Sequence, residues 1–144
     1  MPAWVVAGYD EYARRLPREF VLELIELKPE PRGHGKTTSQ VLAAEAVHIG
    51  AVCAGSTVVA LDENGAVWTT LDLARRIGHW RDEGARVAFV IGSADGLAPS
   101  VKSSAVHTLA LSGFTLPHGL VRVLLAEQIY RAMSLLTGHP YHRA

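Results

Sequence analysis

The sequence predicts an α/β domain with a mainly parallel β-sheet covered by helices. Three short apolar runs, at residues 57–61, 87–91 and 108–111, contain β-branched residues and lack polar alternation, which is typical of strands buried on both faces. Helical patterns separate these runs, and strands that alternate with helices form parallel sheets. The chain has 144 residues, 49% of them hydrophobic, so we expect one domain, 1–144, with one core.

The first third of the chain predicts a helix, a strand and a second helix. Residues 1–16 have amphipathic helical spacing, which Pro17 ends. The sequence FVLELIEL at 20–27 is typical of a strand, and 28–38 is a loop rich in Pro, Gly and charge. The alanine-rich run 39–54 then predicts a helix.

Three further helices are expected between and after the buried strands. Residues 69–84 place Thr69 and Asp72 at the spacing of a capping box and carry one apolar face. A shorter helix is expected over 99–106, and a long amphipathic helix over 118–137. The last seven residues, GHPYHRA, show no pattern.

Charge and cysteine content restrict the class of protein. The net charge is zero, which argues against a lysine-coated polyanion binder, but residues 97–144 hold a single acid, Glu127, and four of the seven histidines. We therefore expect an anionic partner at the C-terminal half. One cysteine, no signal peptide and no apolar run long enough for a membrane span predict a soluble cytoplasmic protein.

Ligands of parallel sheets bind beyond the carboxyl ends of the strands, where three loops follow the buried runs. These loops read LDENG from Leu61, GSADG from Gly92 and SGFTLPHG from Ser112. Gly, Ser and Asp let the backbone approach a ligand closely, although any one of these loops alone is more simply an ordinary turn.

Several common kinds of ligand site lose support because their sequence motifs are absent. The sequence has no GxGxxG after a strand, no GxxxxGK[ST] and no GxSxG, which removes support for a dinucleotide site, a P-loop and a hydrolase nucleophile elbow. His139 and His142 have no neighbouring carboxylate, so they are a solvent-facing pair or contacts to a partner, and no metal site is predicted.

Motifs spread over the whole chain resemble the ribosomal RNA large-subunit methyltransferase H family, of the SPOUT class. The resemblance is carried by GSADGL, FTLPHGLVRVLLAEQIYRA and GHPYHRA, together with WVVAGYDEYARRLP, PRGHGK and VVALDENGAVWTT. It implies a trefoil knot in the C-terminal half, about residues 87–144, which is an exception to the rule that folds are unknotted. It also implies a homodimer that methylates N3 of a pseudouridine in the 23S rRNA of the assembled bacterial ribosome, with S-adenosylmethionine as cofactor.

The resemblance also assigns residues to the cofactor, and basic side chains are the candidates for RNA contacts. The cofactor contacts carried over by position lie in the same three loops: Leu61, Gly92, Ser112, Gly113, Phe114, Thr115, Leu116 and Pro117. Expected RNA contacts are Arg32, Lys36, His118 and Arg131, although His118 has packing or capping as its alternative.

The basic C-terminal tail is the expected catalytic element. The imide N3 of pseudouridine is a weak acid, so removal of its proton near neutral pH requires a base or a nearby cation. His139, His142 and Arg143 are the candidates, and the sequence leaves open which one is the base. Arg122 and Glu127 are either a structural pair or residues of a dimer or RNA contact.

Two departures from the family qualify the resemblance. The family usually reads GGPEG where this chain has Ser93, Ala94 and Asp95, so we expect crowding in this loop and weaker cofactor binding. Family members also carry a first strand of about ten residues ahead of the segment that matches Met1. That strand is absent here, and we expect the native start to lie upstream.

Two alternative functions follow. One is a catalytically impaired ribosome-binding SPOUT homologue, and the other is a small-molecule nucleotide-binding α/β protein. Dimerisation is expected because residues 118–137 are apolar over more than one helical face.

Overall fold

A computed structural model describes residues 1–33 and 35–143, with the side chains of all of these except His142 and Arg143. Within this part of the chain the sheet has three strands: β1 (Thr57–Val67), β2 (Val87–Val90) and β3 (His107–Ala110). They lie in the order β2-β1-β3 and both pairings are parallel. The predicted parallel α/β fold is confirmed, whereas the trefoil knot stays a prediction.

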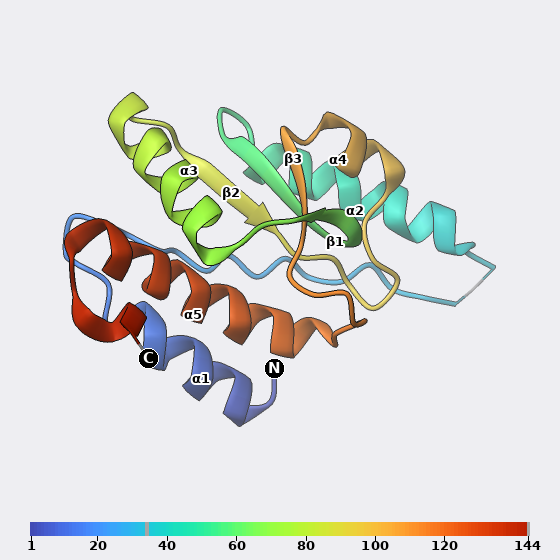
Figure 1. The fold of residues 1–144 in the computed structure, drawn as a ribbon. Helices are drawn as coiled ribbons and strands as arrows, with labels where there is room; N and C mark the ends of the chain where they lie inside the picture. Colours follow the sequence, from blue (N-terminus) through green and yellow to red (C-terminus); the bar gives the residue numbers. More distant parts are fainter. Residues whose placement is uncertain (34, 144) are drawn as a thin grey trace.

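Helices cover both faces of the sheet (Figure 1). One core cluster packs β1 and β3 against α3 and α5, and a second packs β1 and β2 against α2 and α4. Helix α1 packs on the outside of α5. The helices are α1 (Ala3–Ala13), α2 (Thr38–Val52), α3 (Thr70–Glu83), α4 (Pro99–Ser104), α5 (His118–Thr137) and the 3-10 helix η1 (Pro140–Arg143).

Capping boxes fix the starts of two helices. The predicted box at the start of α3 is confirmed, since Thr69 and Asp72 each accept a hydrogen bond from the other's backbone N–H. Thr37 and Gln40 form an equivalent box at the start of α2. Helix α2 therefore begins one residue earlier than the alanine-rich run predicted.

Strand β1 continues beyond its predicted end at Leu61. Leu61 and Ala66 both pair with Leu109, so residues 62–65 bulge out of the ladder at the carboxyl edge of the sheet. Gly65 closes this bulge against β3, where an added Cβ would lie 2.6 Å from the carbonyl oxygen of Thr108.

We expect Gly65→Ala to destabilise the fold. The methyl group would overlap backbone that cannot rotate away, so the free energy of unfolding should fall by about 3 kcal/mol, the upper end of overpacking costs. The matched control is Gly50→Ala in α2, whose Cβ would meet open space; alanine there should stabilise the helix by about 0.5–1 kcal/mol. Denaturant titration measures both, and equal stabilities would contradict the bulge geometry.

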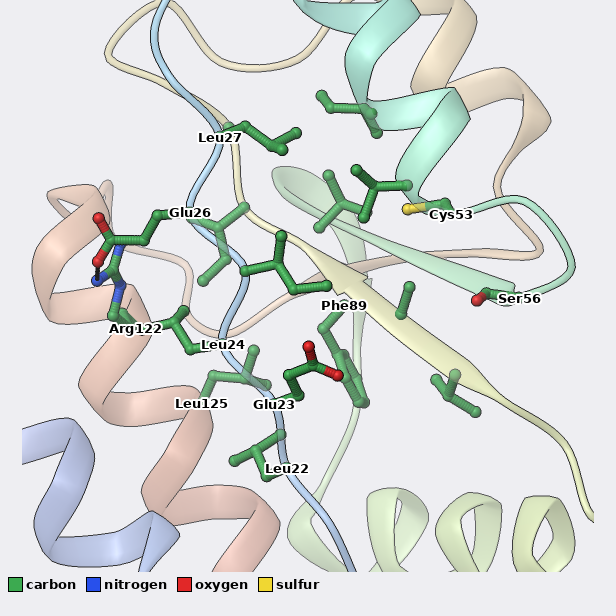
Figure 2. Close-up of a pocket in the computed structure, with 18 of the residues that line it drawn as sticks. Leu22, Glu23, Leu24, Glu26, Leu27, Cys53, Ser56, Phe89, Arg122 and Leu125 are labelled. Carbon is green, nitrogen blue, oxygen red and sulfur yellow. Dashed lines mark hydrogen bonds and ion pairs between the residues drawn. The ribbon is translucent and has the colours of Figure 1, made fainter.

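The predicted strand at 20–27 is wrong. This segment is extended but belongs to no sheet, and several of its apolar side chains are exposed, with Val21 at 82%. The local pattern favours a strand, but a strand also requires a neighbouring edge within hydrogen-bonding distance. The open edge of β2 runs alongside the segment with a cavity between them (Figure 2).

Candidate active site

The three candidate loops follow parallel strands and therefore gather at one edge of the sheet (Figure 1). Ala60 pairs with Val90, and Leu61 with Leu109, so Leu61, Gly92 and the loop from Ser112 all leave the sheet at this edge. The hydroxyl of Thr115 donates a hydrogen bond to Glu63 Oε2 at 2.5 Å, which joins the third loop to the first. Their roles in cofactor binding stay predictions.

The second loop is a tight turn that requires glycine. A Cβ on Gly92 would lie 2.6 Å from the carbonyl carbon and oxygen of Gly96, and Gly96 itself has φ of 82°. An isolated antiparallel bridge between Ser93 and Gly96 closes the turn. The backbone of this loop is thus fixed before any ligand binds.

The residues that depart from the family pattern have partners here. Ser93 donates to Glu45 Oε1 at 3.0 Å and accepts from Arg32 at 3.1 Å, while Asp95 accepts from Arg32 Nε at 2.7 Å. The hydrogen bond to Asp95 raises the pKa of the Arg32 guanidinium. Arg32, expected to contact RNA, therefore lies against the second loop and connects it to the segment before α2.

We expect Arg32→Ala to weaken S-adenosylmethionine binding more than it weakens the fold. The ion pair is over one-third exposed on the arginine side and is screened by solvent, so its loss should leave the free energy of unfolding nearly unchanged. Loosening the second loop should raise the Kd for S-adenosylmethionine about three- to tenfold. Calorimetry measures this change. Lys36→Ala is the control, because Lys36 contacts Glu30 at 3.8 Å and not the second loop. If Arg32→Ala leaves the Kd unchanged and weakens ribosome binding, Arg32 is an RNA contact and does not support the cofactor loop.

The third loop presents open backbone to a ligand. Gly113, Phe114 and Thr115 are exposed, and no atom lies within 4 Å of a Cβ added to Gly113. The N–H of Phe114 donates to Ser112 Oγ at 2.9 Å, which shapes the start of the loop. Open backbone next to apolar Leu116 in the same loop fits a flat heterocycle such as adenine. A neighbouring cavity of about 1270 Å³ includes Gly92 and His118 among its lining but not Leu61 or residues 112–117.

The C-terminal tail forms η1 and packs against the end of α5. The Tyr141 hydroxyl donates to Glu127 Oε2 at 2.7 Å, and Arg131, paired with the same oxygen at 2.9 Å, lies 4.8 Å from the Tyr141 ring centre. Burial and the hydrogen bond to Glu127 raise the pKa of Tyr141 to about 12. Glu127 and Arg131 thus hold the tail in place, and Arg131 is engaged within the protein rather than extended toward RNA.

Of the predicted catalytic residues, only the side chain of His139 lies within the described part of the chain. His139 is exposed, and its Nδ1 accepts a hydrogen bond from the Tyr141 N–H at 3.2 Å. A neutral imidazole that accepts at Nδ1 carries its proton on Nε2, so His139 presents a donor on its outer side. The side chains of His142 and Arg143 lie outside the described atoms.

The structure does not bring the tail to the cofactor loops within one chain. The third loop precedes the first residue of α5, and the tail follows its last turn (Figure 1). A 20-residue helix is about 30 Å long, which separates the two groups by far more than a contact distance.

Acidic partners are the site residues that sequence reasoning missed. Arg122 pairs with Glu26 at 2.8 Å and Glu127 with Arg131, so of the two alternatives for Arg122 and Glu127 the structural pair is not formed. The i,i+4 spacing of Glu127 and Arg131 was a usable signal. Glu45 and Glu63 carried no local signal, because their partners are distant in sequence.

A parallel α/β sheet with three glycine-containing loops at its carboxyl edge is the architecture of a ligand-binding α/β enzyme. The chain belongs to the SPOUT methyltransferase family: a family model described as "Predicted SPOUT methyltransferase" matches residues 1–142. The resemblance drawn from the motifs is confirmed, and the protein is a methyltransferase.

Curated relatives are similar over the full chain. A protein of Nitrosospira multiformis is 55% identical, and proteins of Burkholderia mallei and Burkholderia pseudomallei are each 54% identical. All three are named ribosomal RNA large subunit methyltransferase H, and the alignments cover 100% of this chain and 93% of each relative.

The described residues contain neither a membrane-spanning helix nor a cluster of metal ligands. Over 1–33 and 35–143, no helix is both long enough and apolar enough to cross a membrane. The same residues contain no group of three or more His, Cys, Asp or Glu side chains that could hold a metal ion.

Proposed function

We propose that the protein transfers a methyl group from S-adenosylmethionine to N3 of a pseudouridine in 23S rRNA of the assembled bacterial ribosome. Membership of a methyltransferase family and the names of relatives 54–55% identical over the full chain support this substrate. The main structural support for the location of the cofactor site is that three glycine-containing loops converge at one edge of the sheet.

The cofactor would be held mainly by backbone. We assign its adenine to the open backbone of the third loop, between the apolar side chains of Leu61 and Leu116, with the fixed turn at Gly92 closing one side. The cofactor supplies a methyl group already activated on a sulfonium, so the protein has to orient it and help the nucleophile lose its proton.

The tail would act on the pseudouridine. His139 presents Nε2–H, which suits donation to a carbonyl oxygen of the base where charge develops as the N3 proton leaves. We assign removal of that proton to His142 and a phosphate contact to Arg143. When bound, S-adenosylmethionine would supply the methyl group to N3 and leave as the neutral thioether.

A complete site would form in a homodimer. Because α5 separates loops and tail by about 30 Å within one chain, a two-fold arrangement is the simplest way to place the tail of one copy over the loops of the other. Exposed Trp4 and Val6 of α1 and Phe114 of the third loop offer apolar surface for it. The apolar surplus of α5 itself is no argument for a partner, since α1 and α3 cover it.

Lys36 and His118 are the RNA contacts that we retain. Both are exposed, and His118 begins α5 directly after the third loop, beside the proposed cofactor site. Arg32 and Arg131 are instead assigned to holding the second loop and the tail.

Ribosomes from a strain that lacks the modification test the proposed activity. With S-adenosylmethionine, mass spectrometry of the digested 23S rRNA should show one added methyl group on a pseudouridine, with much less on protein-free rRNA. Co-sedimentation without methylation would instead support the impaired ribosome-binding homologue. Absence of both would overturn the substrate assignment.

A further inference from the structure

A basic hollow lies at the amino-terminal edge of the sheet, opposite the cofactor loops. Thr57 is the first residue of β1 and His107 is the first residue of β3, and the two strands are parallel, so both residues mark the edge at which the strands begin. The hollow between them and α3 has a volume of about 470 Å³, within the range of ligand pockets, about 300–1,000 Å³. Arg75, Arg76 and His79 of α3 line it. None of these side chains belongs to the proposed cofactor or pseudouridine site.

The guanidinium of Arg76 is held by aromatic contacts. Its central carbon lies 4.2 Å from the centre of the Trp68 ring, which is a cation–π contact. Its Nη1 lies 3.3 Å from His107 Nε2, and the rings of Trp68 and His107 pack edge-to-face with their centres 5.2 Å apart. A guanidinium held in this way loses little conformational freedom when it binds a further acceptor.

His107 supplies a hydrogen-bond donor but no charge. A guanidinium only donates, so His107 Nε2 accepts from Arg76 and the neutral ring carries its proton on Nδ1. Burial and, after it, the charge of Arg76 lower the pKa of His107, which favours this neutral form. The positive charge of the hollow therefore comes from Arg75 and Arg76.

The two arginines lack a carboxylate partner in the part of the chain that the structure describes. Glu83, which also lines the hollow, contacts His79 Nε2 at 3.0 Å, and Asp72, about one turn earlier on α3, is engaged in the capping box. Arg76 is half-buried, and buried charges are usually paired because their removal from water is costly. An anion from outside the chain would provide the missing partner.

The chemistry of the hollow favours a phosphate of a nucleic-acid backbone. The planar fork of an arginine matches two oxygens of a phosphate, and the N–H of a neutral histidine suits a further oxygen. Arg75 and His79 are exposed, and Val106 beside them is 63% exposed, so the rim is open to a backbone that continues past the hollow. A proposed substrate in 23S rRNA makes RNA the polyanion at hand.

We propose that this hollow binds a backbone phosphate of RNA through Arg75 and Arg76. It would be a second RNA-binding element, at the sheet edge away from the cofactor loops. Phosphate contacts fix position and carry no sequence information, so the hollow would raise the affinity for RNA without reading its bases. The choice of RNA rests on the proposed function, whereas the affinity for phosphate does not.

The salt dependence of RNA binding tests the proposal without any measurement of methyl transfer. Each phosphate contact contributes about 0.7–0.9 to the slope of log K against log salt concentration. A short RNA duplex is titrated with the full chain by fluorescence anisotropy at about 0.05–0.2 M salt. Arg75→Gln should lower the slope by about 1 and weaken binding about five- to tenfold. Arg81→Gln is the matched control on the same helix, because Arg81 contacts Asp82 at 3.5 Å and lies outside the hollow; its slope should equal that of the wild type.

Variants of Arg76 separate phosphate binding from packing. Arg76→Gln removes the charge and the contact with Trp68 together, so its Tm is measured beside its slope. Arg76→Lys keeps a positive charge, and a lysine also binds phosphate as a point charge. The slope should fall by about 1 in Arg76→Gln and be restored in Arg76→Lys.

Inorganic phosphate distinguishes a free anion from a nucleic acid. The nuclear magnetic resonance signals of the His107 ring should shift on addition of the RNA duplex, and inorganic phosphate should shift the same signals at higher concentration. Tighter binding of inorganic phosphate than of the duplex would overturn RNA as the ligand. An unchanged slope in Arg75→Gln, or an equal loss in Arg75→Gln and Arg81→Gln, would overturn the hollow as a site. Unmethylated ribosomes with the salt effect intact would instead count against the proposed function alone.

Discussion

An equimolar mixture of two inactive variants is expected to regain about a quarter of the wild-type rate of methyl transfer. One variant is truncated after Gly138 and lacks the tail, and the other carries Gly92→Ala in the second loop. Random exchange of subunits makes half of the dimers mixed. If the site combines the loops of one copy with the tail of the other, each mixed dimer holds one intact site. Methyl incorporation into unmodified ribosomes, after the two variants are refolded together, measures the recovery.

The converse mixture distinguishes the shared site from a site within one chain. A double variant, with Gly92→Ala and the truncation, is mixed with the wild-type protein. For a shared site the mixed dimers are inactive, because each of their two sites lacks either its loop or its tail. For a site within one chain, these dimers would keep half of the activity and the first mixture would stay inactive.

Gly92→Ala alone is expected to abolish useful cofactor binding. Its Cβ would lie 2.6 Å from the carbonyl group of Gly96, so the turn from Gly92 to Gly96 has to open and its backbone shifts at the carboxyl edge of the sheet. Positioning of a cofactor tolerates little displacement, so the Kd for S-adenosylmethionine should rise at least about a hundredfold. Isothermal calorimetry measures it.

Gly78→Ala is the matched control for Gly92→Ala. This glycine lies within α3, and its Cβ would meet flexible side-chain ends, Leu136 at 3.2 Å and Arg81 Nη2 at 4.0 Å. We expect a change of about 1 kcal/mol in the free energy of unfolding and an unchanged Kd. A Kd that changes equally in the two variants would mean that cofactor binding follows overall stability and not the turn.

The sequence predicted those parts of the fold that depend on local pattern. The apolar runs of β1, β2 and β3 and the capping box at Thr69 are local signals, and the structure contains each of them. The bulge that extends β1 was not predictable, because it forms against β3, whose residues are far away in sequence. The extended segment has the composition of a strand and lies beside an edge that it does not reach.

The site was predictable in its backbone but not in its ion pairs. Turn-forming residues after buried strands marked all three loops. By contrast, Arg32 pairs with Asp95, 63 residues away in sequence, and Arg122 pairs with Glu26, 96 residues away. No spacing rule predicts such pairs. Glu127 is near Arg122 in sequence, which offered their pairing as one alternative, and the structure does not contain that pair.

Helix α5 has the third candidate loop before its first residue and the tail after its last turn, and the proposed site needs both. The contacts of Tyr141 with Glu127 and Arg131 hold the tail against the far end of α5, so in the proposed homodimer the length of this helix would set the distance between the two reaction centres. Insertion of a single turn, about 5.4 Å, would move both centres out of alignment at once. The proposed shared site would therefore constrain the number of residues in this helix as strongly as the identity of any residue that contacts the substrate.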